Sequence, residues 1–236
     1  MIEVKDLVKQ YGSFRAVDHL SFTVEKGQIY GFLGPNGAGK STTMNMITGY
    51  LSATEGTVLI DGHDIFLEPE EAKRHMGYLP EIPPVYPDMN PQEYLTFAGE
   101  LKGIPRKGLM GEVERVMGLT GITHMRLRLI KNLSKGYRQR VGFACALLGD
   151  PQVIILDEPT SSLDRTVQAQ ILALLKGLQE KHRLAYIFIS HDLQVVRALC
   201  HQVIVLRQGE VVEQGECQRV FTAPTQSYTR QLLAAD

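Results

Sequence analysis

The sequence predicts an α/β fold: a mostly parallel sheet covered by helices on both faces, with an antiparallel β subdomain and an inserted helical subdomain. Runs that are apolar on both faces and separated by helical stretches indicate the buried parallel strands: 28–33, 153–156, 185–189 and 203–206. Near the amino terminus, Ile2 and Val4, and later Phe22 and Val24, sit among polar residues, as in antiparallel strands with one solvent-exposed face.

The helical insert begins after the proline-rich residues 82–87, which cannot continue a strand or a helix because proline fixes φ and lacks a donor. Helical patterns follow at 91–102, 109–119 and 134–148, and Asp150-Pro151 stops the last one. The turn Gln208-Gly209 predicts a hairpin near the end of the chain. We therefore predict a single domain over 1–236, with core segments 1–82 and 151–236 and a helical subdomain at 83–150.

Composition excludes several classes of function. The chain has 236 residues and a formal net charge of −1, which gives no electrostatic reason to expect nucleic acid as a partner. Cys145, Cys200 and Cys217 are far apart and show no metal-ligand spacing, so we interpret them as free thiols in a reducing compartment. The amino terminus lacks a signal-peptide pattern, and no apolar run approaches the roughly 18 residues needed to cross a bilayer. We expect a cytoplasmic protein that reaches a membrane only through a partner.

A glycine-rich loop follows the first buried strand and precedes a helical pattern at 42–47. It fits the phosphate-loop pattern G-x-x-x-x-G-K-[ST] with the residues Gly34, Pro35, Asn36, Gly37, Ala38, Gly39, Lys40, Ser41 and Thr42. Glycines let successive backbone N–H groups point at phosphate oxygens, and the following helix turns its positive end toward the same charge. Lys40 is expected to reach the β- and γ-phosphates of ATP, and Ser41 to bind Mg²⁺.

Two adjacent carboxylates, Asp157 and Glu158, follow the buried strand 153–156 at the edge of the sheet where open α/β sheets bind ligands. Because successive side chains of a strand point to opposite sides, the two carboxylates can serve different tasks. We assign Asp157 to Mg²⁺ and Glu158 to polarising the attacking water.

The segment Leu133-Ser134-Lys135-Gly136-Tyr137-Arg138-Gln139-Arg140, taken with these two motifs, resembles the signature of the nucleotide-binding domain of an ABC transporter. The resemblance covers essentially the whole chain and implies a P-loop NTPase with a RecA-like core. The family's usual signature is L-S-G-G-Q, so Lys135 and Tyr137 are departures. Ser134 can cap the following helix, whose free N–H groups form an anion site. In the family this site grips the γ-phosphate bound by the other subunit, which implies a head-to-tail dimer that contacts ATP through Ser134, Lys135 and Gly136.

Further positions follow from the same resemblance. Tyr11 stands where the family places an aromatic ring against adenine, although it can also be a partly buried tyrosine at a strand end. His191, after the strand 185–189, matches the family's switch histidine at the γ-phosphate, and Ser161-Ser162-Leu163-Asp164 matches the D-loop, with Asp164 at the partner subunit. Glu81 occupies a position where most members have glutamine; it can offer oxygen to Mg²⁺ and act in catalysis, or be a solvated loop carboxylate.

The two parts of the chain resemble different branches of the family. Residues 1 to about 150 resemble ATPases of ABC-2-type exporters, and residues 166–233 resemble ATPases of peptide and microcin uptake systems. All methionines lie at or before Met125, in line with this division. One hypothesis is a chimera, natural or engineered, joined within or near 156–164.

The resemblance implies the ATP-binding subunit of an ABC transporter, which hydrolyses MgATP between two subunits to drive a separate integral-membrane permease. The protein would form a homodimer, or a heterodimer with another ABC ATPase, and lie on the inner face of the cell membrane. Two alternatives stay open: a soluble ABC-type ATPase without a permease, and a non-hydrolysing nucleotide-dependent scaffold. The transported substrate and its direction stay open too.

Overall fold

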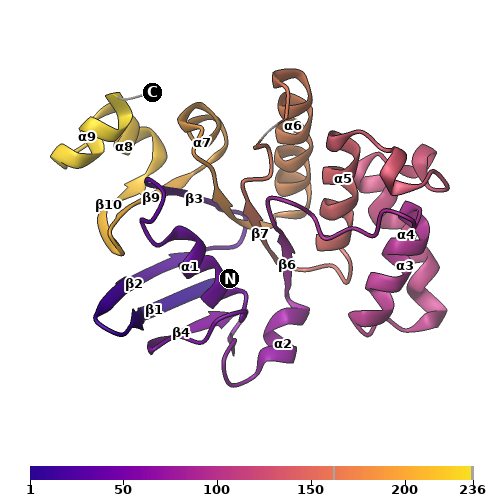
Figure 1. Ribbon diagram of the computed structural model, residues 1–236, viewed down its shortest axis with the longest axis horizontal. Helices are drawn as coiled ribbons and strands as arrows, with labels where there is room; N and C mark the ends of the chain where they lie inside the picture. Colours follow the sequence, from indigo (N-terminus) through magenta and orange to yellow (C-terminus); the bar gives the residue numbers. More distant parts are fainter. Residues whose placement is uncertain (162, 235–236) are drawn as a thin grey trace.

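The computed structural model of the protein describes residues 1–161 and 163–234, and its centre is a six-stranded sheet (Figure 1). The strands lie in the order β10-β9-β3-β8-β7-β6, and all neighbours pair in parallel except β10, which closes a hairpin with β9. Their bounds are β3 Ile29–Leu33, β6 Met76–Leu79, β7 Val153–Asp157, β8 Ala185–Ile189, β9 Gln202–Arg207 and β10 Glu210–Glu216. The predicted mostly parallel sheet is confirmed.

A second, antiparallel sheet packs beside the first, with the strand order β2-β1-β4-β5. Its strands are β1 Ile2–Tyr11, β2 Phe14–Val24, β4 Glu55–Ile60 and β5 His63–Asp64. The β1–β2 hairpin places Tyr11 directly opposite Phe14. This hairpin matters for function because it brings an aromatic edge to the mouth of the pocket described below.

Alternation along the parallel strands divides the apolar core into two layers. Tyr30 and Phe32 of β3 face the antiparallel sheet and α1 (Lys40–Ile47), which supplies Met44 and Met46 to the same layer. Ile29 and Leu33 face the other way, toward the helices that cover the opposite side. Those helices are α5 Lys135–Ala146, α6 Arg165–His182, α7 Leu193–Leu199 and α8 Cys217–Thr222 (Figure 1). Helix α1 therefore starts at the edge of the parallel sheet and packs between this sheet and the antiparallel one.

The segment between β6 and β7 is helical, as the sequence predicts, and lies at one side of the sheet (Figure 1). It contains α3 Pro91–Leu101 and α4 Arg106–Thr120, the 3₁₀ turns Thr123–Met125 and Ile130–Asn132, and α5. Asn90 begins α3 with a capping box, since its side chain accepts from the Glu93 amide while the Glu93 carboxylate accepts from the Asn90 amide. Gly121, in the left-handed conformation, ends α4.

Some elements differ from the sequence-based prediction. Helix α5 ends at Ala146, before the expected end at 148, because the Leu148 amide donates to Cys145, three residues back; Gly149 and Asp150 then take positive φ values of 80° and 54°. The strands β4 and β6 carry glycines and give little strand signal. Gly77 in β6 is required by packing, since a Cβ there would collide with the backbone of Ala146 at the end of α5.

The small helix α2 (Pro69–Arg74) links β5 to β6, and α9 (Ser227–Ala234) lies near the carboxyl end. No helix among residues 1–161 and 163–234 is long and apolar enough to cross a membrane.

The Glu213 carboxylate of β10 ties the entry of α9 to the sheet, and its residue is only 7% exposed. One oxygen accepts from the Thr225 amide at 2.9 Å and the Thr225 hydroxyl at 2.8 Å, and the other accepts from the Gln226 amide at 3.2 Å. Burial by itself raises the pKa of Glu213, but the hydrogen bonds outweigh burial and lower this pKa to about 2.

Glu213→Gln should lower the free energy of unfolding at neutral pH by about 2 kcal/mol, because the amide loses the charge-assisted bonds. The pKa falls from 4.5 to about 2 on folding, so the stabilisation is full above the unfolded value and is lost as pH falls toward the folded one. Urea unfolding at about pH 7 and about pH 3 should therefore show a smaller gap between wild type and variant at low pH. Glu210→Gln, at an exposed position of the same strand, is the control. An unchanged gap would contradict the role of Glu213.

Candidate active site

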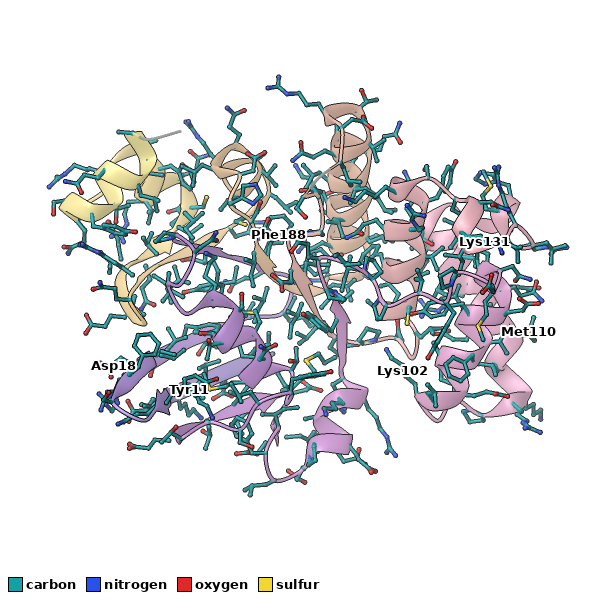
Figure 2. The ribbon with its side chains drawn as sticks, in the orientation of Figure 1. Tyr11, Asp18, Lys102, Met110, Lys131 and Phe188 are labelled. Carbon is teal, nitrogen blue, oxygen red and sulfur yellow. The ribbon has the colours of Figure 1, made fainter. Side chains whose placement is uncertain are left out.

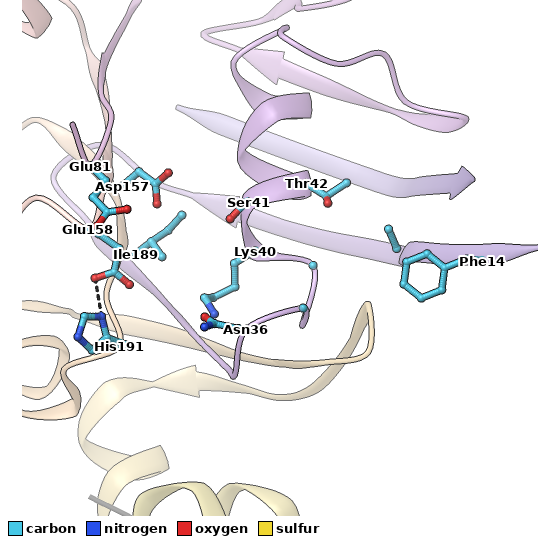
Figure 3. A pocket seen from close by; sticks show the side chains of 13 residues that line it. Phe14, Asn36, Lys40, Ser41, Thr42, Glu81, Asp157, Glu158, Ile189 and His191 are labelled. Atoms are coloured by element: carbon cyan, nitrogen blue, oxygen red, sulfur yellow. Dashed lines mark hydrogen bonds and ion pairs between the residues drawn. The ribbon is translucent and has the colours of Figure 1, made fainter. Parts of the chain in front are cut away.

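A pocket with a volume of about 580 Å³ opens at the carboxyl ends of β3, β7 and β8 (Figure 3). Figure 3 shows three carboxylates on one side of it and the start of α1 on the other. The residues that line it come from the loop before α1, the β1–β2 hairpin and the ends of the parallel strands: Phe14, Ala16, Asn36, Gly37, Gly39, Lys40, Ser41, Thr42, Glu81, Asp157, Glu158, Ile189 and His191. Most of the candidate site residues predicted from sequence therefore lie together.

The glycine-rich loop ends in Gly39, the N-cap of α1, which has a φ of 101° and offers no side chain to the first amides. A Cβ at this position would lie 2.6 Å from the Ala16 carbonyl oxygen, so only glycine fits. The first intrahelical bond is donated by the Thr43 amide to the Gly39 oxygen at 2.9 Å. The N–H groups of the first turn lack intrahelical acceptors, which makes this helix end suited to an anion.

Lys40 is the buried cation of the loop, at 9% exposure. Its Nζ donates to the carbonyl oxygens of Gly34 at 2.6 Å and Pro35 at 2.9 Å. Burial lowers the pKa of the Lys40 ammonium, and the charges of Glu158 and Asp157 act in the opposite direction. The lysine is thus held across the loop, within electrostatic reach of both carboxylates.

Asp157 ends β7 and receives a hydrogen bond from the Tyr78 hydroxyl of β6. Burial and then the charge of Glu81 raise the pKa of Asp157, while Lys40 and the bond from Tyr78 lower it. Burial, followed by the charge of Asp157, raises the pKa of Tyr78 to about 12, so this hydroxyl stays protonated and keeps donating. Glu81 accepts from the Ser161 hydroxyl at 3.1 Å.

Glu158 lies just beyond β7 and adopts a positive φ of 48°, which turns the chain at the end of the strand. Its amide donates to the Ile189 oxygen at 3.0 Å, and its Oε2 lies 3.0 Å from His191 Nδ1. Burial raises the pKa of Glu158, whereas the hydrogen bond and the charge of His191 lower it. Simple strand alternation would send Asp157 and Glu158 to opposite sides; the turn instead lets both line the pocket.

The signature residues Ser134, Lys135 and Gly136 do not line this pocket. Ser134 caps α5 as expected, with its Oγ accepting from the Tyr137 amide at 3.4 Å. Gly136 is buried against α6, where a Cβ would lie 2.5 Å from Val167 Cγ1. The serine is exposed, so the start of α5 presents its first turn to the surface.

Other predicted positions also lie outside the pocket lining: Tyr11, Asp164, and the phosphate-loop residues Gly34, Pro35 and Ala38. Tyr11 is on the antiparallel sheet (Figure 2), 49% exposed, with Lys9 Nζ 5.3 Å from its ring centroid, whereas Phe14 across the turn lines the pocket. Asp164 caps α6, its Oδ1 accepting from the Val167 amide at 3.0 Å. Ser162 of the same predicted loop lies outside the described residues.

Sequence reasoning missed Phe14 and Tyr78, which belong to no motif. An exposed aromatic two residues after a Tyr-Gly turn was the available signal for Phe14. Within the described part of the chain, no group of three or more histidine, cysteine, aspartate and glutamate side chains is arranged to hold a metal ion. A cation at this pocket would therefore need ligands besides these residues.

Comparison with known proteins gives a consistent picture. The family model for ABC transporters matches residues 17–161. An uncharacterized ABC transporter ATP-binding protein of Escherichia coli, YejF, is 46% identical over 93% of this chain, and the methionine import ATP-binding protein MetN of Bordetella avium is 36% identical over 100%. The chain spans 44% of the length of the first relative and 67% of the second.

Solved structures agree with the fold. CbiO1 of Clostridium perfringens, part of the ABC transporter complex CbiONQ, superposes with a TM-score of 0.86 at 27% identity, covering 94% of this chain and 90% of its own. The ATP-binding cassette MJ0796, in a dimeric post-hydrolysis state bound to ADP and Pi, superposes with a TM-score of 0.79 at 25% identity, covering 92% and 99%. Because the two relatives align across residues 156–164, the comparisons give the hypothesis of a chimeric join no support.

Gly136→Ala should lower the free energy of unfolding by about 1–3 kcal/mol, because the added methyl group pushes α5 away from Val167. Adding Val167→Ala should restore much of the loss by removing the colliding methyl group. Gly177→Ala on α6, where nothing lies within 4 Å of the new Cβ, is the control and should be neutral or stabilising by up to about 1 kcal/mol. Chemical denaturation measures all three; equal effects of the two alanines would show that the α5–α6 contact does not require glycine.

Proposed function

Because the chain belongs to the ABC transporter family of ATP-binding proteins, we propose that it binds and hydrolyses ATP to drive a separate membrane permease. The observation that carries this proposal is the meeting of Lys40, Glu158 and His191 in one pocket at the amino end of α1. Such a pocket combines anion-binding amides, a cation and a hydrogen-bonded carboxylate, which are the parts needed to hold a triphosphate and activate a water.

The triphosphate would lie on the first turn of α1, where the amides after Gly39 and the Lys40 ammonium offer positive charge. Lys40 already donates to two loop carbonyls, so the lysine is held close to where the β- and γ-phosphates would bind. The base would stack at the β1–β2 hairpin. Phe14 lines the pocket and Tyr11 lies opposite it in the hairpin, so Phe14 is the better placed of the two rings.

Ser41, Asp157 and Glu81 provide one hydroxyl and two carboxylates, an all-oxygen donor set that suits Mg²⁺. Magnesium sites of this kind use few protein ligands and complete their coordination with substrate phosphates and water, which fits the lack of a protein-only metal cluster in the described chain. When bound, Mg²⁺ would neutralise charge on the β- and γ-phosphates. The Tyr78 hydroxyl beside Asp157 would help to orient this carboxylate.

Hydrolysis needs a water oxygen to attack the γ-phosphorus while the bond to the β–γ bridging oxygen breaks, giving ADP and phosphate. Glu158 would accept a hydrogen bond from that water and take its proton. His191 lies 3.0 Å from the Glu158 carboxylate and would hold it in place and contact the γ-phosphate. Lys40 would stabilise the charge that develops on the phosphate oxygens.

A second subunit would complete the site. The start of α5, with Ser134, Lys135 and Gly136, lies outside the lining of the chain's own pocket but exposes a capped helix end suited to an anion. In a head-to-tail pair, this end would reach the γ-phosphate bound by the partner, and Asp164 would lie near the contact. The dimeric state of MJ0796 supports such an assembly, as a homodimer or with a related ATPase. ATP would close the pair and hydrolysis would release it.

The permease would dock on the helical subdomain, 83–150, including the loop 82–87 at its start. Ile82 is 80% exposed and Tyr86 is 51% exposed, and apolar side chains this open favour a protein partner. The chain would then lie at the inner face of the membrane, held there by the permease. CbiO1 is part of a transporter complex, and this supports the arrangement proposed here. A soluble ABC-type ATPase would instead purify without any membrane protein.

Glu158→Gln should slow ATP hydrolysis by at least about a hundredfold, because the amide cannot take the proton of the attacking water. Nucleotide affinity should stay near that of the wild type, and the ATP-bound dimer should accumulate. Phosphate release measures turnover, and size-exclusion chromatography with ATP measures the dimer.

Glu180→Gln, at an exposed position of α6, is the matched control and should turn over normally. Undiminished turnover by the Glu158 variant would show that Glu158 does not take the proton of the attacking water. Absence of turnover in the wild type would favour the scaffold alternative.

A further inference from the structure

The position of His191 depends on the backbone that carries it, since its side chain is 73% exposed and has little packing of its own. The histidine meets Glu158 at 3.0 Å (Figure 3), and a small rotation of the loop 190–192 would break this contact. A group that fixes this loop therefore also sets the geometry of the two candidate catalytic side chains.

Asp192 is the anchor of this loop, and its two carboxylate oxygens do different things. Oδ1 accepts from the amides of Gln194 at 3.0 Å and Val195 at 3.1 Å, which caps α7. Oδ2 accepts from the side-chain amide of Gln168 on α6 at 3.2 Å. The same Gln168 nitrogen lies 3.5 Å from the hydroxyl of Thr160, which follows Glu158 on the other loop.

Gln168 stands on a rigid support. The α6 helix begins at the capping residue Asp164, and Ile171 and Leu175 bury its inner face in the core. The neighbouring Val167 touches the place where Gly136 lets α5 approach. A hydrogen bond from such a support restricts the Asp192 loop more than a bond from a mobile side chain would.

We propose that Gln168 is a positioning residue: through Asp192 and Thr160 it holds the loop of His191 beside the loop of Glu158. This inference rests on the proposed function, because it assigns Gln168 a role in hydrolysis. Among the residues that the structure describes, the two loops are tied by the Glu158–His191 contact, the bond from the Glu158 amide to the Ile189 oxygen, and the bridge through Gln168. Gln168 affects turnover by keeping the geometry of the other two ties.

The test swaps the side-chain amide of Gln168 and the carboxylate of Asp192 between the two positions. Gln168→Glu places two carboxylates against each other and should lower kcat roughly tenfold, as for loss of one hydrogen bond plus like-charge repulsion. The KM for ATP should change little, because the phosphate loop is untouched. In the double variant Gln168→Glu/Asp192→Asn, the asparagine oxygen can still cap α7 while its NH₂ group donates to Glu, so kcat should return to within about threefold of wild type.

Gln170→Glu adds the same charge at an exposed position two residues along α6 and should leave kcat unchanged. A second readout does not need turnover: amide hydrogen exchange of the nucleotide-free chain over residues 190–195. Exchange there should speed up roughly tenfold in Gln168→Glu and return toward wild type in the exchanged pair. Thermal melting checks that all variants fold.

The proposal is overturned if Gln168→Glu matches Gln170→Glu in both kcat and loop exchange, or if the exchanged pair restores neither. A general destabilisation would instead raise exchange across the chain and would not be reversed by the second substitution. If the wild type itself shows no turnover, the proposed function fails, and loop exchange alone still decides whether Gln168 holds the loop.

Discussion

The three central strands β3, β8 and β7 are neighbours, run in the same direction and end at one edge of the sheet, and the site depends on this constraint. β3 and β8 are buried along their whole length and β7 up to Leu156, so the register of each strand is fixed by the core, and the loop that follows it has a defined origin. The phosphate loop lies more than a hundred residues before Glu158 in the sequence, and His191 lies 33 residues after Glu158. The parallel arrangement brings all three to one pocket and places Glu158 and His191 within hydrogen-bonding distance.

Charge is the second organising feature of the pocket. Glu81, Asp157 and Glu158 line it together with the single buried ammonium of Lys40. Burial raises the pKa of both Asp157 and Glu158, while the charge of Lys40 acts in the opposite direction on both. The proposed Mg²⁺ would add positive charge beside Asp157 and Glu81.

Much of the fold and of the site could be predicted from sequence because motifs report local geometry. The phosphate loop requires glycines at particular positions, and Ser134 caps a helix through its own chain neighbours, so both are visible in a short segment. Tyr78 and Gln168 could not be found in this way, since each acts on residues outside its own segment, and Phe14 belongs to no motif. The turn at Glu158 could not be predicted either, because a positive φ in a glutamate has no sequence signal. This turn goes with the bond from the Glu158 amide to the last residue of β8.

The central claim is that one ATP site combines the phosphate loop of one subunit with the capped α5 end of another, and complementation tests it most directly. Lys40→Ala removes the loop cation, and Ser134→Asp keeps a good helix cap but sets a negative charge against the γ-phosphate. Each variant alone should hydrolyse almost no ATP, because both sites of its homodimer are damaged. In a mixture, heterodimers contain one intact site, so phosphate release should recover to about a quarter of wild type if subunits pair at random. A mixture no more active than its components would contradict the shared site.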